Sequence, residues 1–404
     1  MGNLVEGNMD STITETIRTY ARAAQQGEKD LLRTLATIPA PSGHEQERAS
    51  LVASWLREEG AREVEIDHAS NVICHLAPKG ATPDLRPLVV FAAHMDVVFP
   101  DVDALPVREE GGRMYAPGVG DDTANLAGLL MATKLLLQDE AALERATKGH
   151  DLLIVANSCE EGLGNLAGTR ALFERYAERI ERFYSFDLYL PQCISEAVGS
   201  ERYEVEAHCQ GGHSYHDFGR PNAIVELSGL VQELYETMPR EGSDGTPITI
   251  NAGTIEGGTS VNSIASRARL RFEFRSTSAL ALKEARSHFA GVVSRRGEAL
   301  SHADDAPEAG LRVSTLGIRP GTGDVDQEEL GRMSEATERI IREVTGEEPD
   351  PSPASTDANI PLSLGIPANT VGTVRGALLH TRDEWVDLAS LEDGLRVILG
   401  LMLQ

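Results

Sequence analysis

The stretches PLVVFAAHMD (87–96), TANLAGLLMATKLLLQ (123–138) and DLLIVANSCEE (151–161) decide the fold. The first and third are short apolar runs typical of buried strands, and the second has the length and composition of a helix. Two strands joined by a helix form a unit in which the strands run parallel. This order indicates an α/β sheet that is parallel at its centre.

The flanking sequence continues the alternation of strands and helices. We expect further strands at EVEIDH (63–68), NVICHLA (71–77), RFYSFD (182–187) and 366–372, and helices at 11–39, 44–60, 164–180, 326–345 and 389–403. Proline and glycine between 39 and 43 separate the first two helices. The sequence therefore predicts a mixed, centrally parallel sheet flanked by helices.

A different order of elements begins near residue 200. A strand, a helix, two strands, a helix and a strand follow one another between 200 and 317, which is the β-α-β-β-α-β pattern of a small two-layer domain. We therefore expect one α/β domain made from residues 1–199 and 318–404, with a second domain of residues 200–317 inserted in it.

The chain is strongly acidic, with 63 Asp and Glu against 37 Lys and Arg in 404 residues and a formal net charge of −26. This balance argues against nucleic acids and anionic membranes as partners, because both attract clustered basic residues. The sequence has no apolar run long enough to cross a bilayer, and its start lacks the features of a signal peptide. Four scattered cysteines do not form a disulfide framework. A cytoplasmic protein is expected.

Ionisable residues follow three of the predicted strands directly. His94 and Asp96 end the first, Glu160 and Glu161 end the second, and Asp187 ends the third. Each one taken alone is best explained as the start of a polar loop. Because the carboxyl ends of strands in an open α/β sheet are where ligands bind, three such ends in succession favour a common site.

The stretch GVGDD (118–122) adds two acids at the same edge. Asp121 or Asp122 is expected to cap the following helix, and the other to join the site. Carboxylates with His94 form a ligand set for Zn²⁺, Mn²⁺ or Co²⁺, and His380 in GALLHTRDEW is a candidate second imidazole. Two metals about 3.5–4 Å apart could activate a water and stabilise a tetrahedral intermediate.

Two motifs in the sequence resemble those of other kinds of functional site. HEQER (44–48) begins like a zinc-protease helix, but Arg48 stands where the second histidine is needed. Gly162, Gly164 and Gly168, with Asp187 further along, imitate a dinucleotide-binding turn. Two glutamates directly before that turn would repel a pyrophosphate, so a dinucleotide-binding protein remains a distant alternative.

Several motifs together resemble the metallopeptidase family M20. They are HMD (94–96), GVGDD (118–122), CEEGLGNLAG (159–168) and STDAN…LHTRDEW (355–385), and their wording is closest to the peptidase T-like branch. Residues 199–224 and 253–276 resemble the lid and dimerisation domain of that family. The resemblance covers nearly the whole chain in the same order, and it implies a homodimer or higher homo-oligomer formed through the inserted domain.

The resemblance also implies roles for the residues at the strand ends. His94, Asp121 and Asp187 would hold one metal, and Asp121 would bridge to a second metal held by Glu161 and His380. Asp96 would orient the His94 ring. Glu160 would be the general base that deprotonates the water and then protonates the leaving amine. A cis peptide bond is expected between Asp121 and Asp122.

Three residues of the inserted domain match positions that contact the substrate in this family. His213 in GGHS would reach into the site of the neighbouring subunit and stabilise the oxyanion. Asn262 and Arg275 would grip the substrate, and the guanidinium of Arg275 suits a carboxylate. Taken alone, His213 would be an ordinary loop histidine and Arg275 a solvated charge.

The chain departs from the family pattern at three places. Many members have Lys-Gly-Gly after the bridging aspartate, where this chain has Thr123-Ala124-Asn125. Residues 374–379, before His380, are bulky where peptidase T-like relatives are often glycine-rich. His216 and Asp217 add polar groups close to His213. These departures leave the metal ligands in place and make the substrate harder to infer than the chemistry.

We therefore expect a dinuclear metal-dependent hydrolase that cleaves an amide or related C–N bond in a small, carboxylate-bearing substrate. A di- or tripeptide is the default substrate. An N-acyl amino acid, or an aromatic amine that is hydrolytically deaminated, is the alternative for the same site. Zn²⁺ is the first choice of metal, with Mn²⁺ and Co²⁺ as alternatives.

Overall fold

The computed structural model describes residues 11–80, 86–304, 306 and 308–404. They divide into two compact units. The first unit comprises the chain up to Glu196 and again from Asp324, and the second is Ala197–Gly323. The second unit is thus an insertion that begins shortly before, and ends shortly after, the segment marked by the change of sequence pattern.

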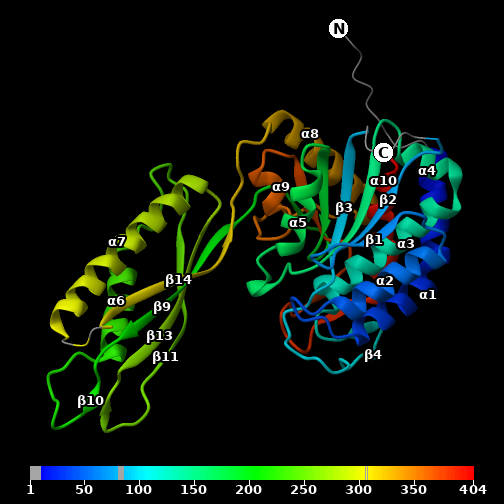
Figure 1. The fold of residues 1–404 in the computed structure, drawn as a ribbon. Coiled ribbons are helices and arrows are strands. Elements are labelled where there is room, and N and C mark those ends of the chain that lie inside the picture. Colours follow the sequence, from blue (N-terminus) through cyan, green and yellow to red (C-terminus); the bar gives the residue numbers. More distant parts are fainter. Residues whose placement is uncertain (1–10, 81–85, 305, 307) are drawn as a thin grey trace. The chain divides into compact units, whose positions relative to one another are not determined.

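The first unit is built on a seven-stranded sheet in the order β1-β2-β6-β3-β7-β15-β8 (Figure 1). In chain order its strands are β1 (Val64–Ile66), β2 (Val72–Leu76), β3 (Leu88–His94), β6 (Asp151–Asn157), β7 (Ile180–Phe186), β8 (Cys193–Ile194) and β15 (Ala368–Val371). β6, β3, β7 and β15 are parallel neighbours, whereas the β1–β2, β2–β6 and β15–β8 pairs are antiparallel. The predicted α/β fold with a centrally parallel sheet is confirmed.

Helices cover both faces of this sheet (Figure 1). They are α1 (Ser11–Thr37), α2 (Gln46–Glu58), α3 (Ala124–Gln138), α4 (Glu140–Ala146), α5 (Ala167–Tyr176), α8 (Gln327–Thr345), α9 (Asn359–Ser363) and α10 (Leu391–Met402). α10 packs against α1, α3 and α8, and α3 also contacts the central strands. Because α3 lies between α10 and the sheet, it is buried on most sides, which explains why it is apolar nearly all round. On the opposite face Phe173 of α5 packs against Phe183 of β7.

Helix α5 begins later than the residue 164 expected from the pattern. Asn165 and Leu166 both have left-handed backbone conformations, with φ of 56° and 60°, which interrupt helical geometry. The three residues Gly162–Gly164 form a separate short turn. The loop after β6 is therefore longer than expected, and it carries Glu160 and Glu161 at its start.

A small four-stranded sheet adjoins the main one and was not predicted. Its order is β16-β17-β5-β4, with β4 at Arg108–Glu110, β5 at Arg113–Tyr115, β16 at Gly376–Ala377 and β17 at Trp385–Asp387. The guanidinium of Arg113 lies 3.6 Å from the ring centre of Trp385, which joins two of its strands. The loop between β16 and β17 contains His380, so this sheet fixes the base of that loop.

The second unit has an antiparallel sheet in the order β11-β13-β9-β14, covered on one face by two helices (Figure 1). Its elements are β9 (Gly199–His208), β10 (Gly212–His213), α6 (Ala223–Thr237), β11 (Thr249–Gly257), β12 (Ser263–Ile264), β13 (Arg267–Ser276), α7 (Ala279–Ala303) and β14 (Gly310–Arg319). The longer elements follow the predicted β-α-β-β-α-β order. Tyr203, Phe272 and Phe289 stack in its core.

Candidate metal centre

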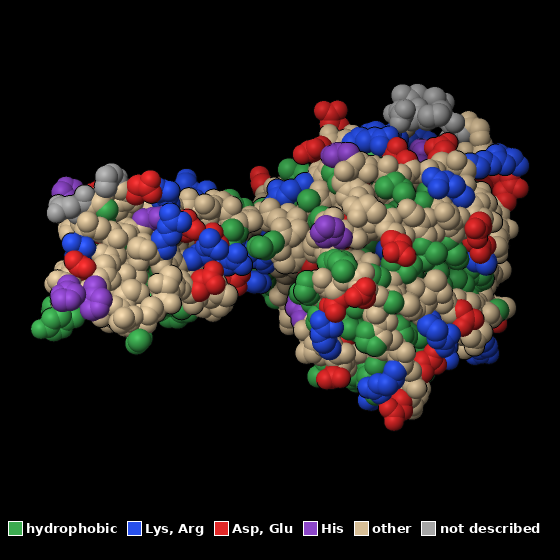
Figure 2. Space-filling model, turned by 60° about the horizontal axis from the view of Figure 1, so that its bottom comes forward, with side chains coloured by type: hydrophobic (Ala, Val, Ile, Leu, Met, Phe, Trp, Pro, Cys, Tyr) green, Lys and Arg blue, Asp and Glu red, His purple; other side chains and the backbone are tan. Residues whose placement is uncertain are grey.

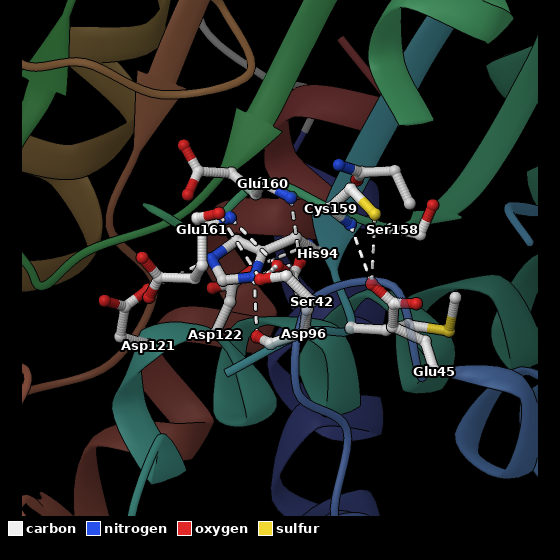
Figure 3. A network of polar contacts seen from close by, with 12 residues as sticks. Ser42, Glu45, His94, Asp96, Asp121, Asp122, Ser158, Cys159, Glu160 and Glu161 are labelled. Atoms are coloured by element: carbon white, nitrogen blue, oxygen red, sulfur yellow. Dashed lines mark hydrogen bonds and ion pairs between the residues drawn. The ribbon is translucent and has the colours of Figure 1, made fainter. Parts of the chain in front are cut away.

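The acidic residues and histidines predicted to form a site come together at the carboxyl ends of the parallel strands (Figure 3). His94 is the last residue of β3, Asp187 follows β7 directly, and Glu160 and Glu161 lie in the loop after β6. Asp121 precedes helix α3. The parallel register of these strands places their ends at one edge, and each of these side chains is buried.

Asp121 lies between two imidazole rings. Its Oδ1 is 3.0 Å from Nε2 of His94, and its Oδ2 is 3.0 Å from Nε2 of His380. The same His380 nitrogen is 3.2 Å from Oε1 of Glu161. One carboxylate thus faces two separate imidazoles through different oxygens, which is the arrangement that a carboxylate bridging two metal ions requires.

Asp187 supplies a further oxygen on the His94 side of Asp121. Ligand atoms of His94, Asp122 and Asp187 lie within 4.8 Å of one another, as do those of Asp121, Glu161 and His380. The Oδ1 atom of Asp187 is buried and has no hydrogen-bond partner among the described residues. A buried carboxylate oxygen without a donor is expensive, so this donor set fits a divalent cation.

The two oxygens of Asp122 are already engaged by the protein. Oδ2 accepts a hydrogen bond from the backbone N–H of His94 at 2.8 Å, and Oδ1 accepts one from Nδ2 of Asn125 at 2.6 Å. Although Asp122 lies near His94 and Asp187, both of its oxygens are thus occupied, whereas the oxygens of Asp121 face the two imidazoles. The expected cis peptide bond between Asp121 and Asp122 is present.

Asp96 connects His94 with the loop that carries the two glutamates. Its two carboxylate oxygens accept hydrogen bonds from the backbone N–H groups of Glu160 and Glu161, each at 2.9 Å. Its Oδ1 also lies 3.4 Å from Nδ1 of His94, and Ser42 donates to its Oδ2 at 2.6 Å. Asp96 therefore fixes the two glutamates relative to the imidazole (Figure 3).

The cluster is crowded with negative charge. Burial and the proximity of Asp121 raise the pKa of Glu161 to about 7 and that of Asp187 well above its ordinary value. Hydrogen bonds to Asp121 and Glu161 raise the pKa of His380 to about 10. Burial and mutual repulsion thus disfavour the charged form of these carboxyls, and divalent ions would offset that repulsion.

Glu384 is a buried acid of this site that the sequence reading did not single out. Its Oε1 accepts hydrogen bonds from the backbone N–H groups of Gly120 and Asp121, at 3.1 and 2.9 Å, and from the Tyr189 hydroxyl at 2.7 Å. Burial and the nearby Asp121 raise its pKa to about 8. Glu384 lies four residues after His380 in LHTRDEW. This short distance from a proposed metal ligand was the sequence feature that could have indicated its place in the site.

Asp357, in the STDAN motif, is a second buried acid whose role was not predicted from the sequence. It accepts hydrogen bonds from Asn157 at the end of β6 and from Thr169 in α5. Burial and the charge of Glu160 raise its pKa to about 7. Asp357 therefore belongs to the outer part of the same acidic cluster.

The motif HEQER has a structural place behind the site. Glu45 accepts hydrogen bonds from the backbone N–H of Cys159, at 3.0 Å, and from that of Gly43, at 2.8 Å (Figure 3). Arg48 is fully buried and donates to the carbonyl oxygens of Met95, at 2.6 Å, and Ile38, at 2.5 Å. The two side chains thereby hold residues that adjoin His94 and Glu160.

Two glycines of the imitated dinucleotide turn, Gly164 and Gly168, serve close packing, whereas Gly162 has a positive φ of 50°. A side chain at Gly168 would lie 2.3 Å from the carbonyl oxygen of Ser158 and 2.4 Å from Oδ1 of Asn71. The start of α5 therefore approaches the loop after β6 too closely for any other residue. Asp187, the acid that would bind a ribose in that reading, lies instead with His94 and Asp122.

The predicted residues of the second unit lie at two separate places. His213 and Asn262 are neighbours, because the backbone N–H of Ser214 donates to the carbonyl oxygen of Asn262 at 3.0 Å and β10 pairs with β12. Arg275 lies near the other end of β13, with both carboxylate oxygens of Glu273 at 3.0 and 3.1 Å from its guanidinium. Arg275 is thus already paired within its own strand.

Comparison with known proteins identifies the family of the chain. A model of the peptidase family M20/M25/M40 matches residues 90–404. Succinyl-diaminopimelate desuccinylase of Corynebacterium glutamicum is 27% identical over 379 residues, covering 90% of this chain and 92% of that protein.

Solved structures share the fold at lower sequence identity. A tripeptidase of Staphylococcus aureus is 20% identical, with a TM-score of 0.71 over 94% of this chain and 98% of that one. A dinuclear metal-binding M20 peptidase of Bacillus subtilis is 16% identical, with a TM-score of 0.64 over 95% of this chain and 98% of that one. Since the family model spans most of the chain and includes every residue of the acidic cluster from His94 to Glu384, this chain belongs to peptidase family M20/M25/M40 and is a hydrolytic enzyme.

Proposed function

We propose that the chain is a dinuclear metal-dependent hydrolase that cleaves the amide bond of a small, carboxylate-bearing substrate, by default a di- or tripeptide. The observation that carries the proposal is the position of Asp121, with one oxygen toward His94 and the other toward His380. His94, Asp121 and Asp187 would hold one metal, and Asp121, Glu161 and His380 the other. Zn²⁺ is the first choice, with Mn²⁺ or Co²⁺ as alternatives.

Bound metals would supply a Lewis acid and lower the pKa of a water. Glu160 is the general base that takes a proton from the attacking water and returns it to the leaving amine. The backbone N–H of Glu160 donates a hydrogen bond to Asp96, which fixes the position of the backbone from which the Glu160 side chain extends. Its side chain is 5% exposed, so proton transfer takes place away from bulk solvent.

His213 suits the role of a neutral hydrogen-bond donor to the oxyanion. Its Nδ1 accepts from the backbone N–H groups of Tyr215, at 3.2 Å, and His216, at 3.4 Å. An acceptor at Nδ1 places the proton of the neutral ring on Nε2. The backbone N–H of His213 donates to Asp217 at 2.7 Å, so the previously unexplained Asp217 anchors this loop.

The length of β13 supports action of His213 on a second copy of the chain. Arg267 and Arg275 are at opposite ends of a regular strand, about 26 Å apart at ~3.3 Å per residue. His213 and Asn262 adjoin the first end, whereas Arg275 is at the other. One small substrate cannot contact both ends, so two copies in a homodimer would supply them.

Basic side chains near Arg275 support a carboxylate in the substrate. Arg275 in β13 and Arg319 in β14 are both register partners of Ser200 in β9, the strand between them. Arg202 lies beside Glu273 on the same face. Burial and the two neighbouring guanidiniums lower the pKa of Arg202. Figure 2 shows basic and acidic side chains side by side on the second unit. Glu273 balances part of this charge, and a substrate carboxylate would balance more.

An N-acyl amino acid is the second candidate substrate. The similarity to a succinyl-diaminopimelate desuccinylase, over nine-tenths of both chains, favours it. Such a substrate contains an amide and a carboxylate, as a short peptide does, so the same residues would act on either class.

The purified protein tests these proposals directly. We expect it to hydrolyse di- and tripeptides when reconstituted with Zn²⁺, Mn²⁺ or Co²⁺, with N-succinyl and N-acetyl amino acids and aromatic amines assayed alongside. Glu160→Gln should remove turnover while the metals stay bound, and Glu178→Gln, at an exposed site on the same unit, should leave it unchanged. Protein that binds no divalent ion, or full activity of Glu160→Gln, would overturn the proposal.

A further inference from the structure

Asn125 is a fully buried amide that touches three separate loops of the site. Its Nδ2 donates hydrogen bonds to the carbonyl oxygen of Gly120 at 3.1 Å, to Oδ1 of Asp122 at 2.6 Å and to the carbonyl oxygen of Leu188 at 3.1 Å. Its Oδ1 accepts from both the backbone N–H, at 3.0 Å, and the hydroxyl of Thr373. Every polar atom of this side chain is therefore in use.

Each of these partners adjoins a proposed metal ligand. Gly120 and Asp122 are the neighbours of Asp121, and Leu188 follows Asp187 directly. Thr373 lies just beyond the end of β15, which is the neighbour of β7 in the sheet. One side chain thus ties together the ends of two adjacent strands and the turn that carries the bridging carboxylate.

This contact connects two of the three places where the chain departs from the family pattern. Asn125 stands where many members have glycine, and Thr373 begins the path through residues 374–379 to His380. Glycine at 125 has no side chain, so it would leave the Asp122 oxygen and the Leu188 carbonyl without this donor. Glycine could not accept the two hydrogen bonds from Thr373 either, so the first departure directly supports the start of the second.

We propose that Asn125 is a positioning residue for the metal centre. Through Asp122 and Leu188 it fixes the spacing between Asp121 and Asp187, and it thereby sets the affinity and geometry of the metal that those two carboxylates share with His94. The inference rests on the proposed dinuclear site. It adds a determinant on the side of Asp187, whereas Glu161 and His380 on the other side have no direct bond to Asn125 among the described residues.

Titration of metal-free protein with Co²⁺, followed by calorimetry and by visible absorption, tests the proposal. In Asn125→Ala we expect one Co²⁺ to bind with about 10- to 100-fold lower affinity and an altered spectrum, as loss of a residue behind a ligand produces. The second Co²⁺ should bind as in the unaltered protein. Asn125→Gly, which restores the residue of the family pattern, should behave in the same way.

Asn369→Ala is the matched control. Asn369 is also fully buried, and its side chain is bonded to Ser334 and Thr337, away from the ligands. It should lose stability and keep both Co²⁺ affinities within about threefold, since its partners hold no ligand. Amide exchange at Thr373 should accelerate in Asn125→Ala, without metal, and stay unchanged in Asn369→Ala.

The outcomes separate this inference from the proposed function. Failure of the unaltered protein to bind two Co²⁺ would overturn both. Two normal Co²⁺ sites in Asn125→Ala, or equal weakening in Asn125→Ala and Asn369→Ala, would overturn the positioning role alone. The same holds if both Asn125 variants fail to fold while Asn369→Ala folds, because Asn125 would then act in folding.

Discussion

Burial and the nearby Asp121 raise the pKa of Glu161, and hydrogen bonds to Asp121 and Glu161 raise that of His380. The pKa of the Glu161 carboxyl is about 7, and the pKa of the His380 imidazole is about 10. Asp121, between two imidazoles that favour its charged form, keeps a pKa below its ordinary value although burial opposes this.

The first prediction concerns the pH dependence of metal binding. A metal binds the deprotonated Glu161 and the neutral His380, so uptake releases protons held by groups with pKa values of about 7 and about 10. We expect the apparent affinity to fall as the pH falls through this interval. Calorimetry in buffers of different ionisation enthalpy measures the proton release, and uptake without release would contradict it.

The second prediction distinguishes the two carboxylates on the His94 side. Asp121 faces both imidazoles, whereas Asp187 is grouped with His94 and Asp122 and with no second imidazole. Asp121→Asn should therefore abolish binding of both metals, and Asp187→Asn should abolish only one. Metal analysis after gel filtration gives the stoichiometry, with Asp103→Asn, at an exposed position, as the surface control. Equal loss in the two variants would show that Asp121 is no bridge.

Three of the five proposed ligands were predictable from the residues alone because they end or closely follow an apolar strand, whereas Asp121 lies before a helix and His380 in a loop. These three are His94, Glu161 and Asp187, and the topology of a parallel sheet brings them together. Asn125, Glu384 and Arg48 were not predictable, since they bind backbone groups whose positions depend on the folded chain. Asn125 was noticed only as a departure from a family pattern.

At the scale of elements, the buried guanidinium of Arg48 connects helix α2 to the end of β3 beside the site. Arg48 donates to carbonyl oxygens of Ile38 and Met95, and burial lowers its pKa to about 10 against the opposing charges of Asp96 and Glu45. The carbonyl of Met95 lies between His94 and Asp96. α2 therefore supports the end of β3 from behind.

The third prediction follows from these bonds. Arg48→Met keeps the length of the side chain and removes its donors, and each buried carbonyl left without a partner costs about 1–3 kcal/mol. We expect a clear loss in the free energy of unfolding, measured by urea denaturation. Arg332→Met, on the exposed face of α8, should change it by less than about 0.5 kcal/mol. Similar values for both variants would contradict the role of Arg48.

Long, strongly patterned elements were predictable and short polar ones were not. β3, β6 and α3 bury nearly all of their residues, so their composition identifies them. β4, with three exposed residues, and the two-residue β16 have no such signal. β4 is a strand because it pairs with the adjacent β5, and β16 because it pairs with β17, while the pairing of β17 with β5 joins distant parts of the chain.

At the scale of the whole molecule, the proposed exchange of His213 between copies gives the fourth prediction. Glu160→Gln and His213→Ala should each be inactive alone. After unfolding and refolding together, half of the dimers are mixed and each contains one complete site, so about a quarter of the activity should return. No recovery in a mixture shown to contain mixed dimers would mean that His213 acts within its own chain.

The second unit begins and ends at adjacent strands, because Ser200 near the start of β9 is the register partner of Arg319 at the end of β14. The polypeptide thus leaves and re-enters the first unit through neighbouring points. All five proposed metal ligands are encoded outside this segment, and the residues proposed to contact substrate are encoded within it. The proposed metal ligands are therefore encoded apart from His213 and the proposed substrate contacts, so replacing the inserted segment would exchange the second set of residues and keep the first.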